Sequence, residues 1–249
     1  MTRRRAARVA AVVGVLALCT WLSALGTRAT ETGAARPAAE PKPPLPSGCE
    51  ERRLEPFSKA SLDGPEDVLG TGDARARVQT SCGVLLIDLF EDRAPLNVNN
   101  FAFLANEGFY DGLPFFRVEK DSVVQTGDPN GHPLDAPNGP GYTVPDELAA
   151  AHYDGYVYGV VAMANRWPVR DSAGSQFFIV VHDREGAEQG DPEPAGYRPR
   201  YTIIGRVARS SWGVLERIAE VDTKGGIDLL ESVEPVAPVT VDSVEIGQR

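Results

Sequence analysis

The sequence predicts a mainly β domain, a barrel or a sandwich with helices over its open ends. Short runs rich in β-branched and aromatic residues recur from residue 84 onward, and Gly, Pro and Asp bound them, as is typical of strands. These runs lie at residues 84–90, 156–163, 177–181, 201–207 and 239–246. Only two segments have the apolar spacing of an amphipathic helix. Many strands with few helices favour a barrel or a sandwich.

The two helices are predicted from apolar residues three and four positions apart. The first has Pro95 in its first turn and ends at Gly108. Its apolar face carries Val98, Phe101, Ala102 and Ala105. The second starts after Ser210 and Ser211, and its apolar face carries Trp212, Leu215, Ile218 and Ala219.

The composition excludes several classes of protein. Hydrophobic residues make up 42% of the 249 residues and charged residues 24%, which argues against a collagen, a coiled coil or a fully disordered chain. A formal net charge of −10 lacks the basic patch that nucleic acid requires, so we expect no nucleic-acid partner. The three histidines fall at no ligand spacing, so we expect no metal; they are His132, His152 and His182.

Residues 1–26 have the layout of a secretory signal peptide, which predicts an exported protein. A basic start contains four arginines, and residues 9–25 follow without a charge. As a helix this run would span roughly 25 Å, short of the ~30 Å core of a bilayer. Small residues at Ala24 and Gly26 suit a signal peptidase. The alternative is an uncleaved membrane anchor formed by residues 9–25.

Residues 27–73 are predicted to form a Pro-rich, largely disordered tether. The stretch is poor in patterned apolar residues, and its prolines favour an extended, polyproline-like chain. They are Pro37, Pro41, Pro43, Pro44, Pro46 and Pro56. The texture changes at about Ala74, so we place one domain at residues 74–249.

Loss of the leader would remove Cys19 and leave Cys49 and Cys82. Two cysteines in an exported protein favour one disulfide. Two free thiols remain the alternative, because spacing alone does not determine pairing.

The common catalytic signatures are absent: the chain has no G-x-S-x-G elbow, P-loop, C-x-x-C or H-E-x-x-H. What remains is a set of strand-like segments that carry polar residues among aromatic ones. Arg117 stands between Phe116 and Val118, and Gln125 follows eight residues later. An arginine in such a strand must face solvent or be satisfied by partners. Taken alone, this segment would be an ordinary alternating strand with a surface arginine.

Taken in order, these segments resemble the cyclophilin family of peptidyl-prolyl cis–trans isomerases, over nearly all of residues 75–249. The matching motifs are Ala94-Pro95, Asn99-Asn100-Phe101, residues 108–112, Phe116-Arg117-Val118, residues 125–129, residues 139–142, Met163-Ala164-Asn165, residues 174–178 and residues 201–205. Exported bacterial members are the most similar, with a leader, a Pro-rich tether and a cysteine before the first core strand. The resemblance implies a closed eight-stranded antiparallel barrel capped by two α-helices. It also implies isomerase activity on X–Pro bonds, no cofactor, proline-containing polypeptides as partners and a monomer.

The resemblance also implies roles for single residues. Arg117 would donate to the prolyl nitrogen as the amide twists, and Gln125 would hold the guanidinium or bind the substrate carbonyl. Phe178 would form the floor of the proline pocket, with Val123 and Tyr197 as walls. The other positions that match the family's substrate site are Phe116, Ser122, Ala164, Asn165, Gln176 and Tyr201.

Some positions depart from the family pattern. Ser122 stands where most members have a phenylalanine wall, Phe116 where many have histidine, and Tyr201 aligns with the histidine at the pocket rim. These changes thin the pocket and leave the donor in place. The alternative function is therefore a cyclophilin-fold proline-peptide-binding chaperone or scaffold with little turnover. A ligand-carrying barrel such as a lipocalin is less favoured, because it would not use the Arg117–Gln125 pair.

Overall fold

The computed structural model describes residues 43–54, 61–70, 72–130, 139–149, 155–189, 195, 199–225 and 233–249. The predicted signal peptide at residues 1–26, its alternative as an anchor at 9–25, and Tyr197 all lie outside these ranges. None of the helices in the described ranges combines the length and the apolar character needed to cross a bilayer.

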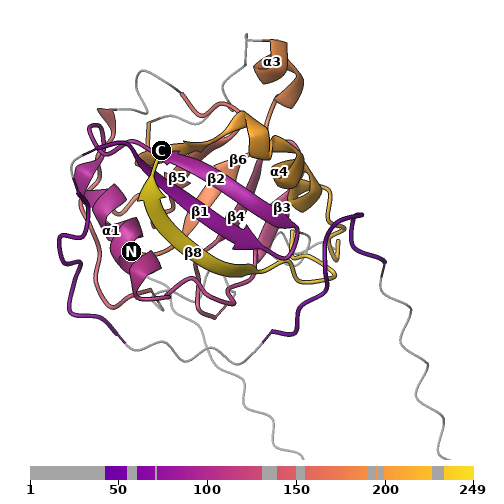
Figure 1. The fold of residues 1–249 in the computed structure, drawn as a ribbon, viewed down its shortest axis with the longest axis horizontal. Helices are drawn as coiled ribbons and strands as arrows, with labels where there is room; N and C mark the ends of the chain where they lie inside the picture. Colours follow the sequence, from indigo (N-terminus) through magenta and orange to yellow (C-terminus); the bar gives the residue numbers. More distant parts are fainter. Residues whose placement is uncertain are drawn as a thin grey trace, which may run out of the picture. The chain divides into compact units, whose positions relative to one another are not determined.

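The core of the molecule is one eight-stranded antiparallel sheet that curls on itself (Figure 1). The strands are β1 Ala74–Thr80, β2 Gly83–Leu89, β3 Arg117–Glu119, β4 Val123–Thr126, β5 Val160–Met163, β6 Phe177–Val180, β7 Ile203–Val207 and β8 Val241–Gln248. Their order across the sheet is β3-β4-β6-β5-β7-β2-β1-β8. The mainly β fold and the number and direction of the strands agree with the prediction.

The described strands form a curled half-barrel, and they do not show the closure into a barrel that was predicted. β3 and β8 are its end strands and form no ladder with each other in the described part of the chain. An isolated bridge joins Pro114 to Thr240, and the N–H of Phe115 donates to the carbonyl of Val239 at 2.8 Å. The N–H of Val241 donates to the carbonyl of Leu113 at 2.8 Å on the other side of this bridge.

Strand β1 was not among the predicted strands. Its sequence alternates alanine and arginine before Val78, and neither residue type favours a strand. Burial nevertheless alternates with period two, with Ala74, Ala76 and Val78 buried and Arg77 exposed. The ladders to β2 and β8 on its two sides impose the conformation.

Both predicted helices are confirmed. They are α1, Pro95–Asn106, and α4, Trp212–Ala219, which follows a short 3₁₀ turn at Arg209–Ser211. In Figure 1, α1 lies to the left of the strands and α4 to their right, and buried residues of both helices belong to one apolar cluster. A third helix, α3 at Arg184–Gln189, was not predicted. It buries only Ala187 among its six residues, too little for an apolar periodicity.

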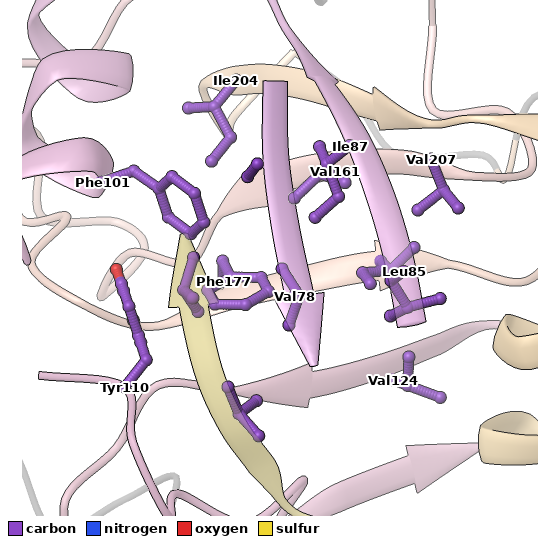
Figure 2. Packing of buried hydrophobic residues seen from close by; sticks show 14 of the residues in the cluster. Val78, Leu85, Ile87, Phe101, Tyr110, Val124, Val161, Phe177, Ile204 and Val207 are labelled. Atoms are coloured by element: carbon purple, nitrogen blue, oxygen red, sulfur yellow. The ribbon is translucent and has the colours of Figure 1, made fainter. Parts of the chain in front are cut away.

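The interior of the curled sheet is filled by one large apolar cluster (Figure 2). Strand residues of this cluster labelled in the figure are Val78, Leu85, Ile87, Val124, Val161, Phe177, Ile204 and Val207. Phe101 of α1 packs on Tyr110 and Phe177, with ring centroids 5.2 and 5.4 Å away. Aromatic contacts therefore bind α1 to the sheet.

Two stretches of the predicted tether, residues 43–54 and 61–70, contact the domain; we call them the strap. A disulfide joins Cys49 to Cys82 with an S–S distance of 2.02 Å, in agreement with the predicted pair. The N–H of Leu62 donates to the carbonyl of Pro140 at 2.7 Å. The Asn99 amide of α1 accepts from the N–H of Val68 at 2.9 Å. The mobility predicted for residues 27–73 stays a prediction, and any test of it must account for these contacts.

Candidate active site

A second apolar cluster lies on the outer face of the sheet. Residues of β4, β5 and β6 are buried on both faces of their strands. Val124, Val161 and Ile179 belong to the interior cluster, and their neighbours in sequence belong to a separate one. Its buried members are Val123, Tyr156, Val157, Val160, Ala162, Phe178, Val180 and Ile203. An antiparallel sheet usually turns a polar face to water, so a second buried apolar cluster on the outer face distinguishes this part of the sheet.

Polar residues continue this outer face toward the edge of the sheet. Arg117 of β3 is the cross-strand partner of Gln125 of β4, and Gln125 is the partner of Phe178 of β6. Phe178 in turn pairs with Ala162 of β5. Cross-strand partners project from the same face. The register therefore sets a cation, an amide and an aromatic ring in one row.

Two acceptors hold the guanidinium of Arg117. Its Nη1 donates to Oε1 of Gln125 at 3.2 Å, and its Nη2 donates to the carboxylate of Glu119. Glu119 lies two residues further along β3 and so on the same face. The side chains of Arg117 and Glu119 are 35% and 37% exposed, so the charge is oriented but still open to solvent. Sequence reasoning missed Glu119, although its two-residue spacing from Arg117 was a usable signal.

A chain of amides extends behind Gln125. Its Nε2 donates to Oε1 of Gln176 at 2.9 Å, and Nε2 of Gln176 donates to Oδ2 of Asp128 at 2.6 Å. Asp128 is only 2% exposed, and its Oδ1 accepts from the N–H of Asn130 at 2.8 Å. Gln125 and Gln176 were predicted as site residues, whereas Asp128 was noted only as part of a motif.

The apolar end of the row is built from rings. Phe178 and Tyr201 form an edge-to-face pair with centroids 5.1 Å apart. The Tyr156 hydroxyl donates to the carbonyl of Tyr201 at 2.9 Å and accepts from the N–H of Tyr201 at 3.0 Å. Burial raises the pKa of Tyr156, so the phenol keeps the proton that it donates. Val123 is buried against this group, and Ala164 packs at its margin.

A family model described as "Cyclophilin type peptidyl-prolyl cis-trans isomerase/CLD" matches residues 75–246. The chain belongs to the cyclophilin family. The predicted enzyme class, peptidyl-prolyl cis–trans isomerase, is confirmed with it.

Relatives and solved structures agree with this assignment. The chain is 35% identical over 169 residues to a peptidyl-prolyl cis–trans isomerase of Schizosaccharomyces pombe, which covers 68% of this chain and 96% of the relative. It is 33% identical to a putative bifunctional phosphatase/peptidyl-prolyl cis–trans isomerase of Streptococcus pyogenes, of which it spans 38%. A Cryptosporidium parvum cyclophilin, solved in the presence of the dipeptide Ala-Pro, superposes with a TM-score of 0.57. That match covers 70% of this chain and 99% of the other at 23% identity, and so speaks for the fold.

The remaining site residues predicted for this cyclophilin lie around the row. Asn165 follows β5, and its Nδ2 donates to the carbonyl of Arg200 at 2.6 Å. Phe116 is 4% exposed beside Arg117. Ser122 lies in the turn that joins β3 to β4, outside the ladder, whose last pair is Glu119 and Val123. Strand alternation therefore does not fix the direction of the Ser122 side chain. In the described ranges, no three His, Cys, Asp or Glu residues are grouped to hold a metal ion.

Proposed function

We propose that this cyclophilin accelerates X–Pro isomerisation with Arg117 as the catalytic residue. Isomerisation makes and breaks no covalent bond, and its barrier of ~18–20 kcal/mol comes from amide resonance. When the amide twists, the prolyl nitrogen recovers its lone pair and becomes an acceptor. A fixed N–H donor there stabilises the twisted state more than either planar state, which is what lowers the barrier.

The geometry of Arg117 carries this proposal. A guanidinium has five N–H bonds, and described residues engage two of those of Arg117, one to Gln125 and one to Glu119. The outer part of the group is left for a substrate. The register places it one strand away from Gln125 and two from Phe178, so a proline ring on Phe178 would present its nitrogen toward Arg117.

The apolar cluster is proposed as the binding site of the proline ring. Phe178 would form its floor, with Val123, Tyr197 and Tyr201 around it. Ser122, Phe116 and Ala164 would line the margin, while the Asn165 backbone and Gln176 would bind the peptide chain. The related cyclophilin of Cryptosporidium parvum was solved in the presence of Ala-Pro, which supports proline-containing peptides as ligands.

The decisive test is an exchange measurement on a short peptide that contains Ala-Pro, with purified protein. We expect faster cis–trans exchange than in buffer, and loss of most of this acceleration in Arg117→Ala with unchanged thermal stability. If the peptide exchanges no faster with the wild-type protein than in buffer alone, the proposal is overturned. That result would favour the second candidate, a proline-peptide-binding chaperone with little turnover, provided that the same peptide still binds. Two observations favour that candidate: Glu119 occupies one donor of Arg117, and Ser122 replaces an aromatic wall.

We further propose that the protein acts outside the cytoplasm on exported polypeptides, as a monomer. The support for export is the predicted leader at residues 1–26 and the Cys49–Cys82 disulfide, since disulfides persist in oxidising compartments. Anchoring by residues 9–25 is the alternative. The N-terminal residue of the protein recovered from the cell exterior distinguishes them: cleavage after residue 26 supports export, and an intact Met1 in the membrane fraction supports the anchor. Light scattering tests the monomer.

We propose, finally, that the seam between β3 and β8 closes the half-barrel in solution. The support is the Pro114–Thr240 bridge together with the hydrogen bond from the N–H of Phe115 to Val239. Slow hydrogen exchange of the Phe115 and Val241 amides is expected. If these two amides exchange at the rate of an unstructured chain, the proposal is wrong and the sheet stays open.

A further inference from the structure

We propose that Asp128 is a positioning residue that sets the hydrogen-bonding direction of Gln176 and Gln125, and so the acceptor that Gln125 presents to Arg117. This inference rests on the proposed function. Asp128 lies at the far end of the amide chain, and two glutamines stand between it and Arg117.

The direction of the chain follows from donor and acceptor chemistry. An ionised carboxylate only accepts hydrogen bonds, whereas a glutamine amide has one accepting end and one donating end. Asp128 therefore requires the Nε2 end of Gln176, at 2.6 Å. This turns Oε1 of Gln176 toward Gln125, which must answer with its own Nε2, at 2.9 Å. Oε1 of Gln125 is then the atom left facing Arg117, at 3.2 Å.

Without that constraint, the amide of Gln125 could present either end to the guanidinium. Arginine has only donors, so an N–H end of Gln125 would face N–H groups and release the guanidinium. Burial strengthens the constraint. Asp128 and Gln125 are 2% and 6% exposed, so water competes little for their polar atoms. The Asn130 N–H, 2.8 Å from Oδ1, fixes the carboxylate itself.

Asp128→Asn keeps size and shape and adds an N–H group. The introduced asparagine keeps its oxygen on the Asn130 N–H and turns its amide nitrogen toward Gln176. Gln176 and then Gln125 must reverse, and two donors meet at Arg117. We expect kcat/KM on the Ala-Pro peptide to fall by about tenfold, the factor expected when one charge-assisted hydrogen bond is lost.

A second substitution restores the chain in the opposite direction. In Gln125→Glu combined with Asp128→Asn, the asparagine donates to Gln176, Gln176 donates to the introduced carboxylate, and that carboxylate still accepts from Arg117. Net charge is the same as in the wild type. In Gln125→Glu alone, Gln176 donates its Nε2 to the introduced carboxylate, so its Oε1 faces the carboxylate of Asp128 and two acceptors meet. This single variant should therefore also lose activity. The double variant should exceed both single variants in kcat/KM.

The experiment measures kcat/KM and thermal stability for the wild type, both single variants and the double variant. Asp88→Asn is the control, because it makes the same change on β2, which is not a neighbour of β4. Wild-type kcat/KM in Asp128→Asn would overturn the inference, and so would a double variant no better than its singles, as a purely structural role predicts. If Asp128→Asn fails to fold, the comparison of Gln125→Glu with the double variant decides in the same way. An inactive wild type would instead refute the proposed function.

Discussion

The carboxylate of Glu119 accepts a hydrogen bond from Nη2 of Arg117, the residue two positions earlier in β3. The pair lies at the polar end of the row whose apolar end is Phe178. Glu119 helps to orient the guanidinium, but it also offsets the positive charge that a twisted prolyl nitrogen would meet. The two effects have opposite signs for catalysis.

Glu119→Gln should raise kcat/KM on proline peptides by up to about fivefold. A half-exposed ion pair contributes only about 0–1 kcal/mol, and Gln125 still orients Arg117 after the change. The gain should come from the positive charge of Arg117, which the Glu119 carboxylate would no longer offset at the substrate. The matched control is Glu188→Gln, which removes the same partner from Arg184 in α3. A decrease in kcat/KM would mean that Glu119 acts mainly by orientation.

Arg117→Lys should fail nearly as completely as Arg117→Ala. Loss of a preorganised donor costs about 10²–10³-fold in rate, and an ammonium on a flexible stem cannot reproduce the planar fork held by Gln125 and Glu119. Both variants should keep the wild-type melting temperature, because Arg117 is partly exposed. Steady-state kinetics with a melting curve for each variant provides the check. Wild-type turnover in Arg117→Ala would end the assignment of Arg117 as the donor.

Ser122→Phe should raise kcat/KM by about tenfold or less. Full burial of an aromatic side chain is worth about 1.5–3 kcal/mol, of which only part reaches the proline ring, and tenfold corresponds to about 1.4 kcal/mol. The gain requires that residue 122 face the pocket from its place in the turn. Unchanged kinetics would show that it faces elsewhere, and a matched Lys120→Phe variant at an exposed position of the same turn should have no effect.

The Cys49–Cys82 disulfide should stabilise the fold by about 3–4 kcal/mol, the value of chain-entropy models for a separation of 33 residues. Urea unfolding of Cys49→Ala/Cys82→Ala against the wild type measures this difference. Thiol labelling of unreduced protein should detect no free cysteine at either position.

Limited proteolysis should show the same effect on the strap. Trimming is expected before residue 43 in the oxidised protein and beyond residue 49 in the variant, because the variant loses the disulfide and keeps only the Leu62 and Asn99 contacts of the strap. Identical fragments from both proteins would contradict a role for the disulfide in holding the strap.

Glu147→Gln should lower the free energy of unfolding by about 0.5–2 kcal/mol. Helix α1 has no capping side chain of its own at Ala94. Instead, the Glu147 carboxylate accepts from the N–H groups of Leu96 at 3.2 Å and Asn97 at 2.9 Å. The control is Glu107→Gln at the other end of α1, where loss of a negative charge should be neutral or stabilising. Equal changes in the free energy of unfolding for Glu147→Gln and Glu107→Gln would show that it does not matter at which end of α1 the negative charge lies.

Local pattern in the sequence determined most of the fold. β-branched runs bounded by turn residues predicted β2, β5, β6, β7 and β8, and apolar spacing predicted α1 and α4. The order of motifs around Arg117, Gln125 and Phe178 also identified the family. Hydrophobic periodicity and turn-forming residues are properties of neighbouring positions, so a single sequence is enough to recognise them.

Only the tertiary structure decided which polar groups meet. Glu147 reaches α1 across 50 residues of sequence, and Gln125 and Asp128 meet Gln176 across 51 and 48. The Pro114–Thr240 bridge and the strand character of β1 likewise depend on partners far along the chain. A hydrogen bond requires two groups within about 3 Å, and that distance depends on strand register. Register is a property of the assembled sheet and not of any one segment.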